Sequence, residues 1–386
     1  MLQLLAHLLN ALATLLRTRA PKPNVVLMSR QAATPSLELR MLHDELAARL
    51  GAGRVSYCLS EPETKSTLRF VAGTLRQLVA ACRNKVVIAD GYSPAISIPK
   101  STGATKVIQV WHAMGAIKQF GYQTLDRPAG RSSSYARVAR MHRNYDVIVA
   151  DGPGSVEAYA QAFGYPREAI RVLGSPTVDF LLAKRAEGLP ASARDELAAA
   201  LPCLANGKRT IVYAPTLRKG PGTAGWVDAS LRALASCCDA ATTNLVYAGH
   251  PLDREVSEPV AQHYACLHVA CGVSTTELLR AADVVITDYS SIAFQAGLLG
   301  TDTCFYVPDI ERYRASTGLN IDWLEQGIGL ACTSAEELLA HLMPQPDEQA
   351  RAGFASFRAF VEGYFAGVRP GGTQRIASLA CELLES

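Results

Sequence analysis

Residues 282–294 read Ala-Asp-Val-Val-Ile-Thr-Asp-Tyr-Ser-Ser-Ile-Ala-Phe. The apolar run 284–286 is typical of a buried strand, and it ends in the polar residues Thr287 and Asp288. The pair Ser290 and Ser291 follows and opens an apolar helix. A strand that leads directly into a helix is the building unit of a parallel sheet covered by helices. This segment therefore predicts an α/β fold.

The start of that helix also predicts a ligand site. Its free amides and positive dipole, together with the hydroxyls of Ser290 and Ser291, form an anion site that suits a diphosphate. A simple N-cap role explains Ser290 without any ligand, but capping and phosphate binding are compatible.

Short apolar strands alternate with helical segments on both sides of residues 282–294. Since a domain usually holds ~150 residues, a chain of 386 residues suggests two domains. The pattern predicts two doubly wound, Rossmann-like domains at 23–185 and 186–386, with the last helix free to pack back on the first domain. The predicted strands are 25–28, 55–59, 86–89, 106–111 and 146–150, then 210–214, 244–248, 283–287 and 304–307.

The composition limits the functions open to this chain. Hydrophobic residues make up 49% and charged residues 19%, so both domains can bury substantial cores. The net charge of +3 permits anionic partners but gives no reason to predict nucleic acid, whose binders usually carry a concentrated basic patch. None of the ten cysteines stands in a Cys-x-x-Cys pair, which favours reduced, buried thiols over a disulfide framework or a zinc site.

Residues 1–22 are predicted to form an amphipathic helix that associates with a membrane. The leucine-rich part is shorter than the ~20 apolar residues of a spanning helix, and its cationic residues follow it, the reverse of a secretory signal. In-plane insertion of the leucines is the preferred interpretation, and packing on the protein or on a partner is the alternative. Pairing with a second copy in a homo-oligomer is left open. The polar residues of one helical face are Gln3, His7, Asn10, Thr14 and Arg17.

A histidine and a lysine follow the strand at 106–111. His112 comes directly after it, where an imidazole can take a proton from an attacking hydroxyl, and Lys118 can neutralise phosphate or pair with a carboxylate. A structural histidine is the alternative.

Two further strands end in basic residues. Arg218 follows the strand at 210–214, and a guanidinium there can hold phosphate oxygens with two parallel hydrogen bonds. A surface ion pair is the alternative for Arg218. His250 follows the strand at 244–248 in the same way, although it is a weak signal alone.

Several functional motifs are absent from the sequence. It holds no GxxxxGK[ST] loop, no complete GxGxxG, no HExxH and no GxSxG. Interpretations as a nucleoside triphosphatase, a dinucleotide enzyme, a zincin or a serine hydrolase therefore lack their motifs. No Asp-x-Asp pair is present among the candidate segments, and no metal ligands are predicted.

The order of these segments resembles that of the CDP-glycerol glycerophosphotransferase family, the teichoic acid primases and polymerases. The family motifs are a Trp-His-Gly with downstream Lys and Gly, a Tyr-Ala-Pro-Thr-x-Arg, a His-Pro, and a Thr-Asp-Tyr-Ser-Ser followed by Phe. This chain departs from them at Ala113, where the family usually has Gly, and at Gly249, before the His-Pro. The matching residues are Trp111, His112, Lys118 and Gly121, then 213–218, His250 and Pro251, and 287–291 with Phe294.

The resemblance implies a glycosyltransferase-B-like fold, with the acceptor side in the first domain and the CDP-linked donor bound by the second. It implies transfer of glycerol phosphate to a hydroxyl of a lipid-linked or polymeric acceptor, with release of CMP, at the cytoplasmic face of the membrane. No cofactor is firmly implied, and a divalent cation is left open. His112 is expected to act as the base with Lys118 beside it. The residues expected to bind the donor are Arg218, His250, Thr287, Asp288, Ser290 and Ser291.

Alternatives to this function remain. The donor is equally compatible with CDP-ribitol, since nothing in these motifs reads the alcohol. A glycosyltransferase or epimerase that acts on a nucleotide sugar would have the same two-domain shape. A third alternative is a non-catalytic member that binds lipid or glycan.

Overall fold

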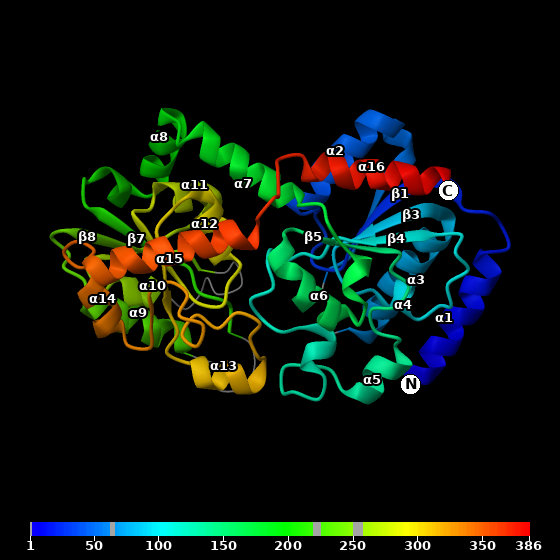
Figure 1. Ribbon diagram of the computed structural model, residues 1–386, viewed down its shortest axis with the longest axis horizontal. Helices are drawn as coiled ribbons and strands as arrows, with labels where there is room; N and C mark the ends of the chain where they lie inside the picture. Colours follow the sequence, from blue (N-terminus) through cyan, green and yellow to red (C-terminus); the bar gives the residue numbers. More distant parts are fainter. Residues whose placement is uncertain (1, 62–65, 219–224, 250–257) are drawn as a thin grey trace. The chain divides into compact units, whose positions relative to one another are not determined.

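The computed structural model describes residues 2–61, 66–218, 225–249 and 258–386, which divide into two compact units (Figure 1). Unit 1 consists of Met1–Phe180, Ser316–Gly318 and Phe365–Ser386, and unit 2 of Leu181–Ala315 and Leu319–Tyr364. Helix α7 (Pro176–Glu187) contains the point where the chain passes from unit 1 to unit 2.

Unit 1 is built on one parallel sheet with helices. Its strands are β1 (Lys22–Ser29), β2 (Val55–Leu59), β3 (Asn84–Ala89), β4 (Lys106–Gln109), β5 (Val147–Ala150) and β6 (Ile170–Val172). Its helices are α1 (Leu2–Leu16), α2 (Leu37–Leu50), α3 (Thr67–Arg83), α4 (Pro94–Ser97), α5 (Ser133–Val138), α6 (Val156–Phe163) and α16 (Gly372–Glu385).

The strands of unit 1 run in the order β2-β1-β3-β4-β5-β6. The order reverses between β1 and β3, so this pair of strands flanks the topological switch point of the sheet. Strand β1 shows why these strands read as continuous apolar runs. Val25 and Leu27 pack with α2 and α16, while Val26 and Met28 pack on the opposite face with α6.

The last helix, α16, packs beside α2 in unit 1 (Figure 1). Asp179 fixes its start, because its carboxylate accepts hydrogen bonds from the backbone N–H groups of Gly371, Gly372 and Thr373 at 2.8, 3.0 and 2.8 Å. These are orphan donors of a helix N-terminus, where a carboxylate is also favoured by the helix dipole.

Helix α1 packs on α3 in the same unit. Leu9 and Ala13 are buried in a cluster with Leu78 and Cys82 of α3. The sequence left two interpretations of this helix, insertion into a membrane and packing on the protein or a partner. The contact with α3 shows that packing on the protein itself is present.

A second face of α1 stays exposed. Leu4, Leu8 and Leu15 have exposed fractions of 75%, 46% and 67%, and their spacing places them on one side of the helix. We call these three residues the leucine stripe. Among the residues that the structure describes, no helix has the length and apolar character needed to span a bilayer.

Unit 2 is built on a second parallel sheet with helices. Its strands are β7 (Arg209–Tyr213), β8 (Thr243–Tyr247), β9 (Leu267–Val269), β10 (Val284–Thr287), β11 (Thr303–Tyr306) and β12 (Ala331–Cys332). Its helices are α8 (Ala191–Ala200), α9 (Trp226–Ser236), α10 (Glu258–Ala261), α11 (Thr275–Ala281), α12 (Ile292–Leu299), α13 (Ile310–Ser316), α14 (Ala335–Leu342) and α15 (Glu348–Tyr364).

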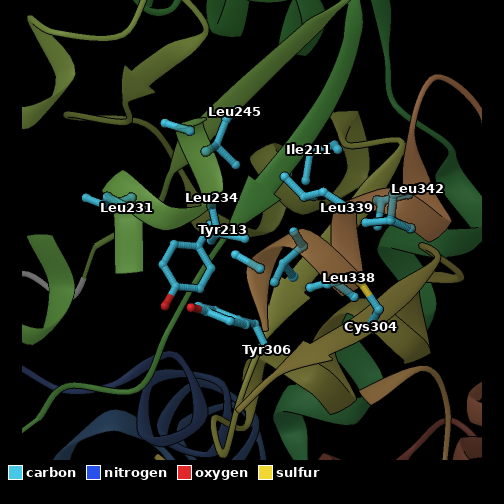
Figure 2. Close-up of a cluster of buried hydrophobic side chains, with 14 of the residues drawn as sticks. Ile211, Tyr213, Leu231, Leu234, Leu245, Cys304, Tyr306, Leu338, Leu339 and Leu342 are labelled. Atoms are coloured by element: carbon cyan, nitrogen blue, oxygen red, sulfur yellow. The ribbon is translucent and has the colours of Figure 1, made fainter. Parts of the chain in front are cut away.

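The strands of unit 2 run in the order β12-β11-β10-β7-β8-β9, with the switch point between β7 and β10. One core cluster brings together Ile211 and Leu245 from the sheet with Leu231 and Leu234 from α9 (Figure 2). The prediction of an α/β fold with two doubly wound sheets is confirmed. Strands β6, β9 and β12 were not predicted.

Candidate functional site

The predicted site residues that the structure describes lie in loops that follow the carboxyl ends of strands. In open parallel sheets, ligands bind outside these ends, at the switch point. In unit 1, the loops after β1 and β3 flank that point, and His112 follows the neighbouring strand β4. In unit 2, residues 214–218 follow β7, and residues 288–291 follow β10.

The His112 imidazole has a defined tautomer. Its Nδ1 lies 3.0 Å from the carbonyl oxygen of Asp90, which can only accept, so Nδ1 carries the proton and Nε2 the free lone pair. The amide nitrogen of Gln31 lies 3.5 Å from the same Nδ1, too long to compete with the Asp90 bond. His112 therefore presents Nε2 as a basic nitrogen.

The surroundings of His112 favour its neutral form. Burial lowers the pKa of His112, the hydrogen bond to the Asp90 carbonyl opposes this effect, and the charge of Lys118 lowers the pKa further. The residue keeps a solvent-exposed surface, so this desolvation comes from the protein packed around the Nδ1 side of the ring. The loop after β4 therefore carries both His112 and Lys118, and the lowered pKa favours an unprotonated imidazole.

The chain turns sharply between β4 and His112. Trp111 has a φ of 58°, in the left-handed region that residues other than glycine rarely adopt. Its ring stacks on Phe120 at a centroid distance of 4.5 Å and meets the edge of Phe163 at 5.3 Å. These contacts hold the turn that carries His112 out of the sheet.

The loop after His112 is anchored to the next strand. Asp151, which directly follows β5 and is 6% exposed, accepts a hydrogen bond of 2.6 Å from the backbone N–H of Gly115. The hydroxyl of Ser155 donates to the other oxygen of the same carboxylate. The segment between His112 and Lys118 is therefore fixed in place.

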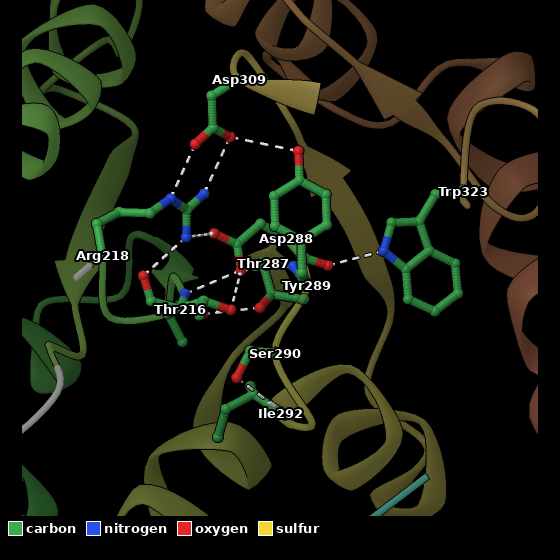
Figure 3. A network of polar contacts seen from close by, with 10 residues as sticks. Thr216, Arg218, Thr287, Asp288, Tyr289, Ser290, Ile292, Asp309 and Trp323 are labelled. Atoms are coloured by element: carbon green, nitrogen blue, oxygen red, sulfur yellow. Dashed lines mark hydrogen bonds and ion pairs between the residues drawn. The ribbon is translucent and has the colours of Figure 1, made fainter. Parts of the chain in front are cut away.

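Asp288 lies at the centre of the unit 2 site (Figure 3). It is fully buried, and its Oδ1 accepts from the backbone N–H and the hydroxyl of Thr216 at 2.9 and 2.8 Å, and from the Tyr289 N–H at 2.6 Å. Its Oδ2 is 2.8 Å from Nη1 of Arg218. Asp288 therefore joins the loop after β7 to the loop after β10.

Arg218 is buried among acidic and aromatic side chains (Figure 3). Its Nε and Nη2 donate to Asp309 at 2.9 and 3.1 Å, and its Nη1 also donates to the Thr216 carbonyl at 2.8 Å. The guanidinium carbon lies 3.9 Å from the ring centroid of Trp226 and 5.1 Å from that of Tyr313.

These contacts define what Arg218 can do. Burial lowers the pKa of Arg218, but the charges of Asp288 and Asp309 raise it above its ordinary value overall. The guanidinium stays charged, and its donors are directed to protein acceptors, with a side-chain exposure of 5%. The structure gives Arg218 a bracing role at the switch point, and phosphate binding by Arg218 stays a prediction.

Thr287 also faces the protein interior. Its hydroxyl donates to the carbonyl of Ala214 at 2.7 Å, and the residue is fully buried. Thr287 and Asp288 thus tie β10 to the end of β7. Ligand contact by either residue stays a prediction.

Ser290 and Ser291 are the partly open residues of this segment. Ser290 Oγ accepts from the backbone N–H of Ile292 at 3.3 Å, and Ser291 is the N-cap residue of α12 without a side-chain capping bond. The backbone that leads to them is held by a hydrogen bond, because Trp323 Nε1 donates to the Asp288 carbonyl at 2.7 Å. The start of α12 therefore presents hydroxyls and backbone donors together.

His250 lies outside the described residues, but the residue before it is described. A Cβ on Gly249 would lie 2.6–2.7 Å from ring atoms of Tyr247, so this position requires glycine unless the ring moves. The departure from the family pattern at Gly249 thus has a local packing reason.

Several residues of the site were not predicted from the sequence. In unit 1 these are Asp90 and Gln31, and in unit 2 Trp226. Asp309 belongs to a segment that resembles the family, but its pairing with Arg218 was not predicted. The position of Asp90 directly after a predicted strand was an available signal. Within the described parts of the chain, no group of three or more His, Cys, Asp or Glu side chains is placed to hold a metal ion.

Comparisons with known proteins identify relatives of this chain. The family model for CDP-glycerol:poly(glycerophosphate) glycerophosphotransferase matches residues 11–375, which confirms the resemblance seen in the motifs. A teichoic acid ribitol-phosphate primase of Bacillus spizizenii is 34% identical over 238 residues, covering 61% of this chain and 59% of the primase. A teichoic acid glycerol-phosphate primase of Bacillus subtilis is 24% identical over 256 residues, covering 66% and 64%.

A solved structure shows the same fold. The wall teichoic acid polymerase TagF matches with a TM-score of 0.72 and 18% identity, over 98% of this chain and 94% of that one. The chain spans about three fifths of the length of the two curated primases.

Proposed function

We propose that this chain, which belongs to the CDP-glycerol:poly(glycerophosphate) glycerophosphotransferase family, transfers a polyol phosphate from a CDP-linked donor to a hydroxyl acceptor and releases CMP. The observation that carries the proposal is the state of His112. Its Nδ1 proton is held by the Asp90 carbonyl and its pKa is lowered by burial, so Nε2 is available as a base.

The acceptor reacts on the unit 1 side. His112 Nε2 takes the proton of a primary hydroxyl on a lipid-linked or polymeric acceptor. The resulting oxygen attacks the β-phosphorus of the donor in line, forming the new phosphodiester bond as the bond to the CMP oxygen breaks. The charge of Lys118 lowers the pKa of His112. The same charge stabilises the anionic phosphate groups of the reacting substrates.

The CDP donor binds on the unit 2 side. The N-terminus of α12, with Ser290 and Ser291, offers backbone and hydroxyl donors to the diphosphate. The loops of this region are held in place mainly by buried contacts of Arg218, Thr287 and Asp288. We also assign His250 to the diphosphate, from its place in the family motif.

The donor alcohol is glycerol or ribitol. Ribitol is favoured by the higher identity to a ribitol-phosphate primase, 34%, than to a glycerol-phosphate primase, 24%. Competition between CDP-ribitol and CDP-glycerol for the same protein measures this preference.

Product analysis tests the reaction class. The proposal requires a phosphodiester and CMP as products, from an assay run both with magnesium and with a chelator. A glycosidic bond or an isomerised sugar, together with a nucleoside diphosphate, would identify a nucleotide-sugar enzyme of the same fold instead.

The leucine stripe of α1 supports attachment to a membrane. Three exposed leucines on one face, followed by the basic residues Arg19 and Lys22, fit a helix that lies in the plane of an anionic bilayer. We assign this contact to the cytoplasmic leaflet, where lipid-linked acceptors and CDP donors meet.

A further inference from the structure

We infer that Gln109 is the positioning residue that sets the tautomer of His112. The inference deepens the proposed function, because it explains how the proposed base acquires a free Nε2. Gln109 is the last residue of β4, three positions before His112, and it is fully buried.

The side chain of Gln109 connects two loops. Its Nε2 donates to the carbonyl of Gly91, after β3, at 3.1 Å. Its Oε1 accepts from the backbone N–H of Trp111, after β4, at 2.9 Å. Both polar atoms of one amide are therefore used, one on each side of the gap between the two loops.

These two partners are the chain neighbours of the residues that form the His112 hydrogen bond. Gly91 follows Asp90, whose carbonyl receives the Nδ1 proton, and Trp111 precedes His112, which donates it. By holding Gly91 and Trp111 at a fixed separation, Gln109 fixes the separation of Asp90 and His112 as well.

The local backbone needs such a contact. Trp111 has a φ of 58°, a conformation that persists only where surrounding contacts enforce it. A Cβ on Gly91 would lie 3.2 Å from the Gln31 amide nitrogen and 3.8 Å from His112 Nδ1, so the two loops approach closely. The hydroxyl of Tyr145 also contacts Gln109, which limits the rotation of the amide.

An amide meets this requirement at every pH. A glutamate in its ionised form accepts but cannot donate to the Gly91 carbonyl, and a methionine thioether cannot donate and accepts only weakly. Without the amide, the Trp111 N–H and the Gly91 carbonyl both lose a hydrogen-bond partner. The loop that carries His112 can then shift. The imidazole is then free to place its proton on Nε2, where it can no longer act as a base.

The test is a measurement of the His112 tautomer by NMR. Protein with ¹⁵N-labelled histidine is compared as wild type and as Gln109→Met, and the His112 signals are identified by their loss in His112→Gln. We expect Nδ1 protonated and Nε2 unprotonated in the wild type, and a shift toward protonated Nε2 in Gln109→Met. In the transfer assay, kcat should fall by about 10²-fold, as for a misplaced catalytic group, with little change in donor KM.

Gln77→Met is the matched control. Gln77 is another fully buried glutamine of unit 1, and its amide contacts Ser29, Ser60 and Ser93 rather than Gly91 or Trp111. The Gln77→Met variant should lose about as much free energy of unfolding as Gln109→Met does and keep the wild-type His112 tautomer. If Gln109→Met does not fold, the isosteric Gln109→Glu takes its place, and the same tautomer shift is expected at a pH where the glutamate is ionised.

Two results would overturn the inference. One is a wild-type tautomer in a folded Gln109 variant, and the other is an equal tautomer shift in Gln77→Met. Failure of the proposed function gives a different pattern, because the wild type would then release no CMP while the tautomer still depended on Gln109.

Discussion

Arg218 and Asp309 face each other with two parallel hydrogen bonds, 2.9 Å from Nε to Oδ2 and 3.1 Å from Nη2 to Oδ1 (Figure 3). A second carboxylate, Asp288, contacts the remaining end of the guanidinium. This buried group lies between the loops after β7 and β10, on the two sides of the unit 2 switch point. The proposed donor site is therefore supported by an internal charge cluster.

Removal of Asp309 should destabilise unit 2. Asp309→Ala leaves Arg218 buried with a single carboxylate, and loss of one partner of a buried pair costs about 3 kcal/mol in the free energy of unfolding. Urea unfolding in a Trp111→Phe background measures it, because the remaining Trp226 and Trp323 both lie in unit 2. Asp302→Ala is the control, since its pair with Arg358 is exposed and should contribute no more than ~1 kcal/mol. Equal decreases in the free energy of unfolding would show that the buried pair of Asp309 with Arg218 contributes no more than the exposed pair does.

Ser291→Ala should weaken donor binding without loss of stability. The Ser291 side chain makes no capping bond in α12, so its hydroxyl is available to the diphosphate. Loss of a hydrogen bond to a charged group costs about 1.5–3 kcal/mol, which corresponds to a dissociation constant for CDP-glycerol raised by about 10- to 100-fold. Calorimetric titration with the donor checks this. Ser334→Ala, at the N-cap of α14, should lower stability by about 1 kcal/mol and leave donor affinity unchanged. An unchanged affinity in Ser291→Ala would remove Ser291 from the site.

His142 should make the protein sensitive to acid. Burial lowers the pKa of His142 to about 3. Between its ordinary value and about 3, the unfolded chain binds one more proton at this residue than the folded one. The contribution of neutral His142 to the free energy of unfolding is therefore fully present above about pH 6.5. It is lost as the pH falls below that value, by about 1.4 kcal/mol per pH unit.

The variant His142→Asn tests this pH dependence. Asparagine tolerates the φ of 58° found at this position and does not titrate. Its free energy of unfolding should fall less steeply than that of the wild type between pH 6.5 and 5, by about 2 kcal/mol over the interval. Parallel pH profiles for the two proteins would contradict a neutral His142 in the folded state.

The leucine stripe should mediate binding to anionic vesicles. Replacement of Leu4, Leu8 and Leu15 by serine removes apolar surface worth up to about 1.5–3 kcal/mol per fully inserted side chain. We expect sedimentation with phosphatidylglycerol vesicles to weaken at least about 10-fold. Leu324→Ser, an exposed leucine of unit 2, is the control and should bind as the wild type does. Unchanged vesicle binding in the triple variant, with loss of a dimer seen by size exclusion, would reassign the stripe to self-association.

The sequence predicted the strands that are buried on both faces. Runs such as 284–286 and 25–28 are apolar at every position because helices cover both sides of the sheet. The missed strands β6, β9 and β12 have two or three residues each, and Arg171 and His268 interrupt the apolar pattern in two of them. Pairing with a neighbouring strand creates these elements, and a short window of sequence does not contain that information.

The site could be predicted only in part for a related reason. His112, Lys118, Ser290 and Ser291 follow predicted strands, so their place at a sheet edge could be inferred from the chain alone. The partner of Arg218 lies 91 residues away in sequence, and its identity depends on the fold. A lone arginine after a strand therefore suggests a phosphate ligand, whereas in the structure Arg218 donates to Asp309 and the Thr216 carbonyl and pairs with Asp288.

The role of Gln109 was hidden in the same way. A polar residue near the end of an apolar strand shows no periodic signal, and its meaning appears only when β3 and β4 pair. The loops after these strands then come together, and the amide is seen to connect them.

The most direct test is CMP release from CDP-ribitol and, separately, CDP-glycerol, with and without a short lipid-linked acceptor. Wild-type protein, His112→Gln and the control His43→Gln, a histidine on α2 that stacks on Tyr57, are compared. The proposal predicts acceptor-dependent release by wild type and His43→Gln, and a loss of at least about 10²-fold in His112→Gln, the usual contribution of a general base. Acceptor-dependent release at the wild-type rate by a folded His112→Gln would contradict the assignment of His112 as the base.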